Sequence, residues 1–218
     1  MRKIRFIYKT VAIVFLGILL SACWKPTYDE VYIDQESRDY YMFKEGSYWI
    51  YQDSITNNTD SVVLMQTLLE YIEKHEGEWK GVIRKKEFYT GECYHYLSDT
   101  TISRSYRIDP EVVSCFPIIV FNSGIQDLEK NIGLCVSAID RHARTSYLPS
   151  YSIEENIFND VKIVWQKYPI RHPGSYYTTD YYIRSYWVKN IGLIRYELYN
   201  SNNEILNTYN LIKYNVKS

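Results

Sequence analysis

The chain of 218 residues has no apolar run long enough to span a membrane. Its longest apolar run, VAIVFLGILL at residues 11–20, has ten residues, whereas a membrane-spanning helix needs about 20. The chain also lacks a Lys/Arg cluster of the kind that docks on anionic lipid headgroups. The sequence therefore excludes a membrane-spanning helix. It also gives no indication that basic residues bind the protein to a membrane.

The short apolar run is typical of a secretory signal peptide, because it follows a basic start and precedes small residues. The basic residues are Arg2, Lys3, Arg5 and Lys9. The next positions, Leu20, Ser21, Ala22 and Cys23, resemble the lipobox of bacterial lipoproteins. That resemblance implies cleavage after residue 22, acylation of Cys23 by fatty acids such as palmitate, and anchoring without spanning. The alternative is a plain signal peptide that happens to precede a cysteine.

Removal of residues 1–22 leaves 21 basic and 26 acidic residues, a formal net charge of −5. This charge argues against a nucleic-acid-binding protein. We expect residues 23–39 to be a lipid-anchored tether, because they contain Pro26, several acidic residues and few apolar ones. Residues 40–218 are then long enough for one β-rich globular domain.

Tyrosine dominates the rest of the composition, with 24 residues beside 5 Trp and 7 Phe. Aromatic and β-branched residues occur in short runs separated by turn residues, a pattern that favours strands. Residues 123–133 instead show helical spacing that begins at Ser123 and ends at Gly133. The sequence predicts a mainly β fold, or a β-rich α+β fold, with at most one or two short helices. The expected strands are residues 48–53, 61–74, 82–89, 160–167, 176–188, 193–199 and 204–216.

Two stretches resemble lipoproteins of the Bacteroidota. Residues 40–52 (YYMFKEGSYWIYQ) are similar to the opening of these domains, and residues 158–164 and 187–197 (FNDVKIV, WVKNIGLIRYE) are similar to their paired strands and Gly-Leu-Ile-Arg turn. Asn190 stands where that family often has Gly. The resemblance implies a single curved antiparallel sheet or half-barrel. Trp24 and Lys25, which follow Cys23, do not resemble an inner-membrane retention signal, so we expect an outer-membrane location, on either the periplasmic face or the cell surface. The resemblance supplies no catalytic residues.

Signatures of catalysis or metal binding are absent from the sequence. It contains no nucleophile elbow G-x-S-x-G and no H-E-x-x-H pair. Cys93 and His95 would share one side of a strand and could begin a metal site with Cys115 or Cys135. Packing, or one disulfide among these three cysteines in an unspecified pairing, explains them better. We therefore expect no metal and no cofactor.

An aromatic stripe at residues 176–188 is the best candidate for binding. Alternation along a strand places Tyr177, Tyr181 and Trp187 on one face and Tyr176, Tyr182 and Tyr186 on the other. Exposed rings in a row could stack on sugars or cover an apolar ligand, whereas cross-strand packing is the simpler explanation.

These observations favour a lipid-anchored, non-enzymatic module that binds a lipid, glycan or protein partner. One alternative is an envelope hydrolase acting on glycan or lipid, which requires a cleft with a His or carboxylate pair within hydrogen-bond reach. Another is a structural subunit of an outer-membrane complex, which requires a large exposed apolar patch.

Overall fold

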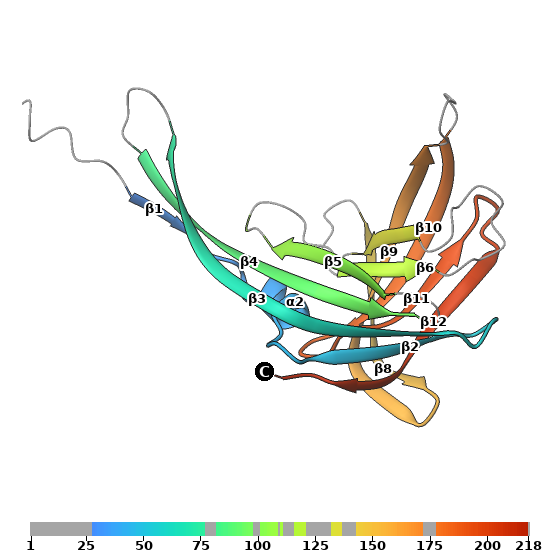
Figure 1. Cartoon of the computed structure of the whole chain (residues 1–218). Helices are drawn as coiled ribbons and strands as arrows, with labels where there is room; N and C mark the ends of the chain where they lie inside the picture. The colour runs from blue at the N-terminus through green and yellow to red at the C-terminus, as the bar shows by residue number, and fades with distance from the viewer. Residues whose placement is uncertain are drawn as a thin grey trace, which may run out of the picture. The chain divides into compact units, whose positions relative to one another are not determined.

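The computed structural model describes residues 28–76, 82–97, 101–108, 110, 116–120, 132–136, 143–171 and 178–217. These residues form strands and one helix, α2 (Figure 1). The elements are β1 (Tyr28–Val31), α2 (Gln35–Tyr41), β2 (Tyr48–Asp53), β3 (Thr59–Glu76), β4 (Val82–Tyr96), β5 (Thr101–Ile108), β6 (Phe116–Val120), β7 (Ile132–Val136), β8 (Arg144–Ile153), β9 (Asn156–Arg171), β10 (Thr178–Val188), β11 (Gly192–Tyr199) and β12 (Ile205–Asn215).

The chain divides into two compact units. In the described residues, unit 1 contains β1 and the adjoining ends of β3 and β4, and unit 2 contains residues 33–70 and those from 87 onward. Within unit 1, β1 pairs in parallel with β4, from Tyr28 opposite Ile83 to Val31 opposite Lys86. Arg84 Nε lies 3.0 Å from an Asp29 carboxylate oxygen and ties the two strands together.

The segment expected to be a tether contains two folded elements, β1 and α2, so folded structure begins before Tyr40. The side chain of Asp34 caps α2 by accepting hydrogen bonds from the Ser37 backbone N–H and hydroxyl, both at 2.8 Å. Such a cap satisfies backbone donors that have no partner inside the helix. β1 was not foreseen because its partner strand lies far along the sequence.

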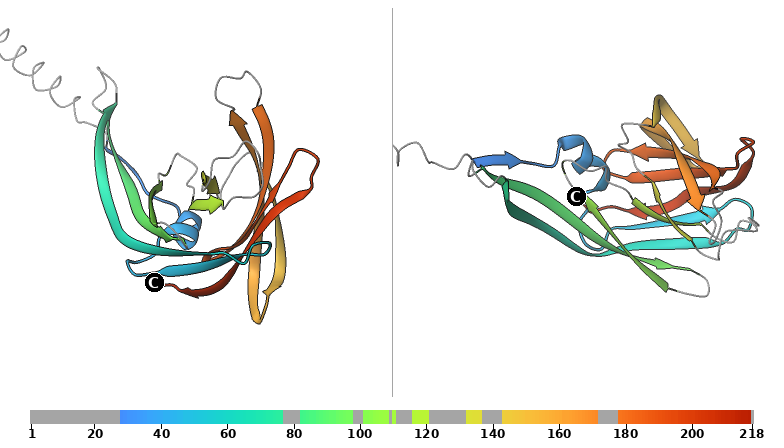
Figure 2. Two further views of the ribbon diagram at one scale, coloured as in Figure 1. Left: turned by 45° about the vertical axis from the view of Figure 1, so that its right-hand side comes forward. Right: turned by 90° about the horizontal axis from the view of Figure 1, so that it is seen from above.

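Unit 2 is built on a strongly curled, open antiparallel sheet, a half-barrel (Figure 2). Its strand order runs β4-β3-β2-β12-β11-β10-β9-β8, with β5 paired to β4. This confirms the expected fold class and the C-terminal meander. The helix expected over residues 123–133 is wrong at its end, because Ile132 and Gly133 belong to β7, which pairs with β6. Residues 123–131 lie outside the described part of the chain.

The helix α2 covers one face of the sheet, which we call the inner face. Tyr40 and Tyr41 of the helix meet Trp187 edge-on, with ring centroids 6.3 and 5.5 Å apart. On the same face Tyr196 stacks on Tyr209 at 4.4 Å. Buried aromatic rings thus fill the core where aliphatic side chains are more usual.

Buried tyrosine hydroxyls in this core donate to backbone carbonyls, which avoids the cost of burying an unpaired polar group. Tyr51 donates to Leu193 O at 2.7 Å and Tyr89 to Phe43 O at 2.6 Å. Tyr106 donates to Tyr41 O at 2.9 Å. These bonds fix the rings to the chain segments around them.

Two glycines allow close approaches that a side chain would block. Gly192 has φ +93° at the turn into β11, and a Cβ there would lie 3.1 Å from the ring of Phe43. Asn190, two residues earlier, has φ +62°, which Asn tolerates. Gly91 faces Tyr106 across the β4–β5 pair, and a Cβ there would lie 2.4 Å from that ring.

Candidate functional site

The outer face of the C-terminal meander carries a row of cationic and aromatic side chains in register. On β9, Trp165 pairs with Arg144 of β8 on one side and with Arg184 of β10 on the other. Arg184 in turn pairs with Glu197 of β11. Paired residues on neighbouring strands lie on the same face, so the row alternates cation, indole, cation and carboxylate.

A second row lies two residues further along and shares this face, because side chains alternate with a period of two. It consists of Lys167, Tyr182 and Tyr199 on β9, β10 and β11. Between the rows and the β11–β12 turn is a pocket of about 590 Å³. Its lining is Arg144, Trp165, Gln166, Lys167, Tyr182 and Asn203.

Stacking positions the side chains beside this pocket. The guanidinium of Arg184 lies 4.5 Å from the ring centroid of Trp165 and 6.0 Å from that of Tyr199. The two rings are themselves 4.9 Å apart. Among the described residues, the Nε–H of Arg184 is buried and has no acceptor. This cation–π arrangement holds a positive charge next to the pocket.

Glu197 organises the other side of this row. It is nearly fully buried. Its Oε2 accepts from the Tyr199 hydroxyl at 2.7 Å and the Tyr186 hydroxyl at 3.3 Å. Its Oε1 accepts from Arg195 Nη2 at 2.6 Å, and Arg184 Nη1 lies 3.6 Å from Oε2. One buried carboxylate therefore holds two arginines and two tyrosines in place.

The tyrosines around Glu197 remain protonated at neutral pH. Burial, and then the negative charge of Glu197, raise the pKa of Tyr186 to about 12. Burial and the hydrogen bond to Glu197 raise the pKa of Tyr199 as well. Both hydroxyls therefore act as donors to the carboxylate and do not compete with it as anions.

Replacement of this carboxylate tests the network. We expect Glu197→Gln to lower the free energy of unfolding by about 2 kcal/mol, because buried arginine and tyrosine donors lose a charged acceptor. Urea denaturation measures the change. The matched control is Glu204→Gln, at an exposed carboxylate that accepts from Asn200. Equal effects of the two substitutions would contradict the role of Glu197.

The aromatic residues singled out from the sequence lie on opposite faces of β10, as alternation predicts. Tyr181 and Trp187 are buried on the inner face, and Tyr177 lies outside the described residues. Tyr182, on the other face, lines the pocket. The sequence did not indicate Arg144, Trp165 or Lys167, because their proximity depends on the register of three strands.

Cys93 and His95 share the inner face of β4, as expected, and both are fully buried. His95 Nδ1 lies 2.8 Å from Asp60 Oδ2. Cys93 is a free thiol, and burial, followed by the charge of Asp60, raises its pKa to about 12. The His–Asp pair is within hydrogen-bond reach but lies in the core and not in an open cleft.

A metal site at Cys93 and His95 would need further ligands. In the described part of the chain, no group of three or more His, Cys, Asp or Glu side chains is placed to hold a metal ion. Cys115 and the side chain of Cys135 lie outside that part. The lipobox residues Leu20, Ser21, Ala22 and Cys23 lie outside it too. Within the described residues, no helix is both long and apolar enough to cross a membrane.

Exposed apolar side chains occur along β3 in unit 2, at Met65, Leu68 and Leu69, each about half exposed. An exposed apolar surface is what the structural-subunit hypothesis requires. Nothing else in the described residues indicates a partner for these side chains.

Two solved structures are similar to the chain. A protein designated a lipoprotein from Parabacteroides distasonis is 14% identical, with 79% of this chain and 96% of that chain covered and a TM-score of 0.46. An exported protein with a YmcC-like fold from Bacteroides fragilis is 11% identical, with 79% and 97% covered and a TM-score of 0.34. No protein-family model and no curated protein matches the chain. Neither designation states an activity.

Proposed function

We propose that this protein is a lipid-anchored component of the bacterial envelope, attached through Cys23 to the outer membrane, that binds an anionic saccharide in the pocket on β8, β9 and β10. The single observation that carries the binding role is the pocket itself, with Arg144 and Lys167 beside the rings of Trp165 and Tyr182. The lipobox at residues 20–23 supports the anchor. The proposal is a binding function and invokes no catalytic step.

The chemistry of the lining favours an anion. Among the described lining residues the charged ones are Arg144 and Lys167, both cations, in a mature chain whose net charge is −5. An arginine guanidinium binds carboxylate or phosphate through paired hydrogen bonds. Arg184, held over Trp165 at the margin of the pocket, shares the single Glu197 carboxylate with Arg195, so the two arginines are not fully neutralised.

The remaining lining favours a sugar ring. Trp165 and Tyr182 offer aromatic faces against which the C–H face of a pyranose can pack, and Asn203 offers an amide group for hydroxyls. Pockets for small ligands commonly combine aromatic walls with a few polar groups that fix orientation. An acidic saccharide can contact all three kinds of side chain in the lining, which are cationic, aromatic and amide.

Isothermal titration with a short oligogalacturonate and its methyl ester tests this proposal, because the two probes share the ring and differ in charge. We expect the acid to bind and the ester to bind at least about tenfold more weakly, since hydrogen bonds to charged groups contribute about 1.5–3 kcal/mol. Arg144→Gln should weaken binding of the acid by a similar factor. Arg144 is exposed, so this substitution should leave the fold intact.

The control is Arg107→Gln, which removes an exposed arginine away from the pocket, with its guanidinium 3.9 Å from the ring centroid of Phe88 on β4. It should leave the affinity unchanged. Equal affinity for acid and ester would overturn the anionic ligand. Binding only to vesicles that carry phosphate headgroups would replace the saccharide by a lipid, and hydrolysis of the oligosaccharide would favour the hydrolase alternative.

A further inference from the structure

Unit 1 lies a short distance along the chain from the proposed lipid anchor. Tyr28, the first residue of β1, follows Cys23 by five residues. Five residues extend to about 18 Å at most. Because the headgroup layer on each side of a bilayer is about 5–8 Å thick, acyl chains on Cys23 keep the start of β1 close to the membrane surface.

The parallel pairing of β1 with β4 also brings parts of β3 and β4 close to the proposed anchor. Tyr28 lies opposite Ile83, near the start of β4, and Figure 1 shows β1 beside this end of β4. The Lys85 ammonium group lies 5.0 Å above the ring of Tyr71 on β3. Residues from three segments of unit 1 therefore lie close to the point at which the anchor joins the fold.

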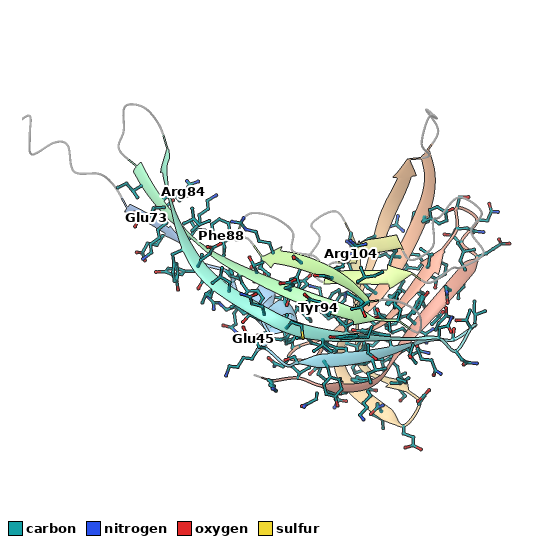
Figure 3. All side chains as sticks on the ribbon, viewed as in Figure 1. Glu45, Glu73, Arg84, Phe88, Tyr94 and Arg104 are labelled. Carbon is teal, nitrogen blue, oxygen red and sulfur yellow. The ribbon has the colours of Figure 1, made fainter. Side chains whose placement is uncertain are left out.

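Unit 1 exposes two tyrosine rings on one face of its strands. Tyr32 and Tyr71 are 53% and 48% exposed. Glu30 pairs with Lys85 across β1 and β4, so it shares a face with the ammonium group over Tyr71, and its carboxylate accepts the Tyr32 hydroxyl. Figure 3 places Arg84 and Glu73 in this unit. Tyrosine and lysine are enriched at membrane interfaces, where an apolar body and a polar end both find a partner.

We infer that Tyr32 and Tyr71 of unit 1 contact the bilayer surface. The occupant of this surface is a lipid headgroup layer, and the inference rests on the proposed acylation of Cys23. The anchor makes the contact intramolecular, so a weak affinity suffices to populate it. β1 then connects the acylated Cys23 to the rest of unit 1 and keeps that unit close to the membrane.

Fluorescence quenching in vesicles tests this contact. Full-length lipidated protein is purified from its host and placed in vesicles of phosphatidylethanolamine and phosphatidylcholine, with or without acyl chains brominated near the headgroup. Tyr71→Trp replaces one of the exposed rings by a fluorescent one, and the emission of the wild-type tryptophans is subtracted. We expect bromination to quench about half of the added emission, because interfacial side chains reach about 5–10 Å into the headgroup and acyl boundary.

Ile157→Trp is the control, since Ile157 of β9 is an apolar residue that is 71% exposed in unit 2. It should show no added quenching. If the protein floats with the vesicles but Tyr71→Trp is not quenched more than Ile157→Trp, the contact is wrong and the anchor stands. If the protein does not float with the vesicles, the anchor fails, and the contact fails with it.

Discussion

The protein is expected to unfold cooperatively between about pH 10 and pH 12, because its core depends on protonated tyrosines. Burial raises the pKa of Tyr89 to about 12 and, together with Glu197, raises that of Tyr186 to about 12. Burial also raises the pKa values of further tyrosines, namely Tyr40, Tyr51, Tyr106, Tyr196 and Tyr199.

The direction of the effect follows from proton binding. In the unfolded chain a tyrosine loses its proton near pH 10, whereas the folded chain keeps it to higher pH. Stability is therefore complete below pH 10 and falls as the pH rises above it. Each such tyrosine lowers the free energy of unfolding by about 1.4 kcal/mol per pH unit in this window. Across this window, the summed loss of stability from all of these tyrosines exceeds the 5–15 kcal/mol by which a typical domain is stable.

Phenolate absorbance and circular dichroism, followed on the same sample, measure this transition. We expect most of the phenolate signal to appear together with the loss of β-sheet structure. Tyr186→Phe should reduce the slope of stability against pH by about 1.4 kcal/mol per unit, since one coupled proton is removed. Tyr147→Phe, at an exposed ring, should leave it unchanged. Titration of all tyrosines near pH 10 with the sheet intact would contradict the tyrosine core.

The second large effect is expected at Asp60. Its Oδ2 pairs with His95 Nδ1, and both side chains are buried. Among the described residues, Asp60 Oδ1 and His95 Nε2 have no hydrogen-bond partner, so the pair is already incompletely satisfied. We expect Asp60→Ala to lower the free energy of unfolding by about 3 kcal/mol, because it leaves the buried imidazole without its acceptor.

Urea denaturation of three variants separates this pair from general damage to the core. Asp29→Ala is the control, since Asp29 pairs with Arg84 at a partly exposed position, where an ion pair contributes at most about 1 kcal/mol. The double variant with Asp60→Leu and His95→Leu should recover much of the loss, because no polar group is then buried unpaired. A double variant less stable than Asp60→Ala would refute this explanation.

Seven strands, β2, β3, β4, β9, β10, β11 and β12, could be predicted from the sequence because their signals are local, whereas β5, β6, β7 and β8 were not predicted. Aromatic and β-branched runs end at polar turns, as at residues 200–203, where Asn203 has φ +62°. β1 could not be predicted, since a four-residue strand is stabilised here by pairing with β4, more than 50 residues later. The sequence predicts the end of a helix at Gly133, whereas Gly133 lies in β7, which pairs with β6.

The candidate site shows the same limit. Alternation along β10 correctly separated Tyr181 and Trp187 from Tyr182 and Tyr186, but it could not decide which face is covered by α2. Trp165 gave no signal in the sequence, because its neighbours Arg144 and Arg184 are brought to it only by the registers of β8–β9 and β9–β10. A site made by side chains across strands requires the sheet to be known first.

Native mass spectrometry of the protein extracted from the membranes of its host tests the central claim most directly. The account predicts a chain that begins at Cys23, carries acyl chains, and retains an anionic saccharide that is lost in the Arg144→Gln variant. A chain without acyl mass, or one that retains a neutral ligand equally in both forms, would contradict it.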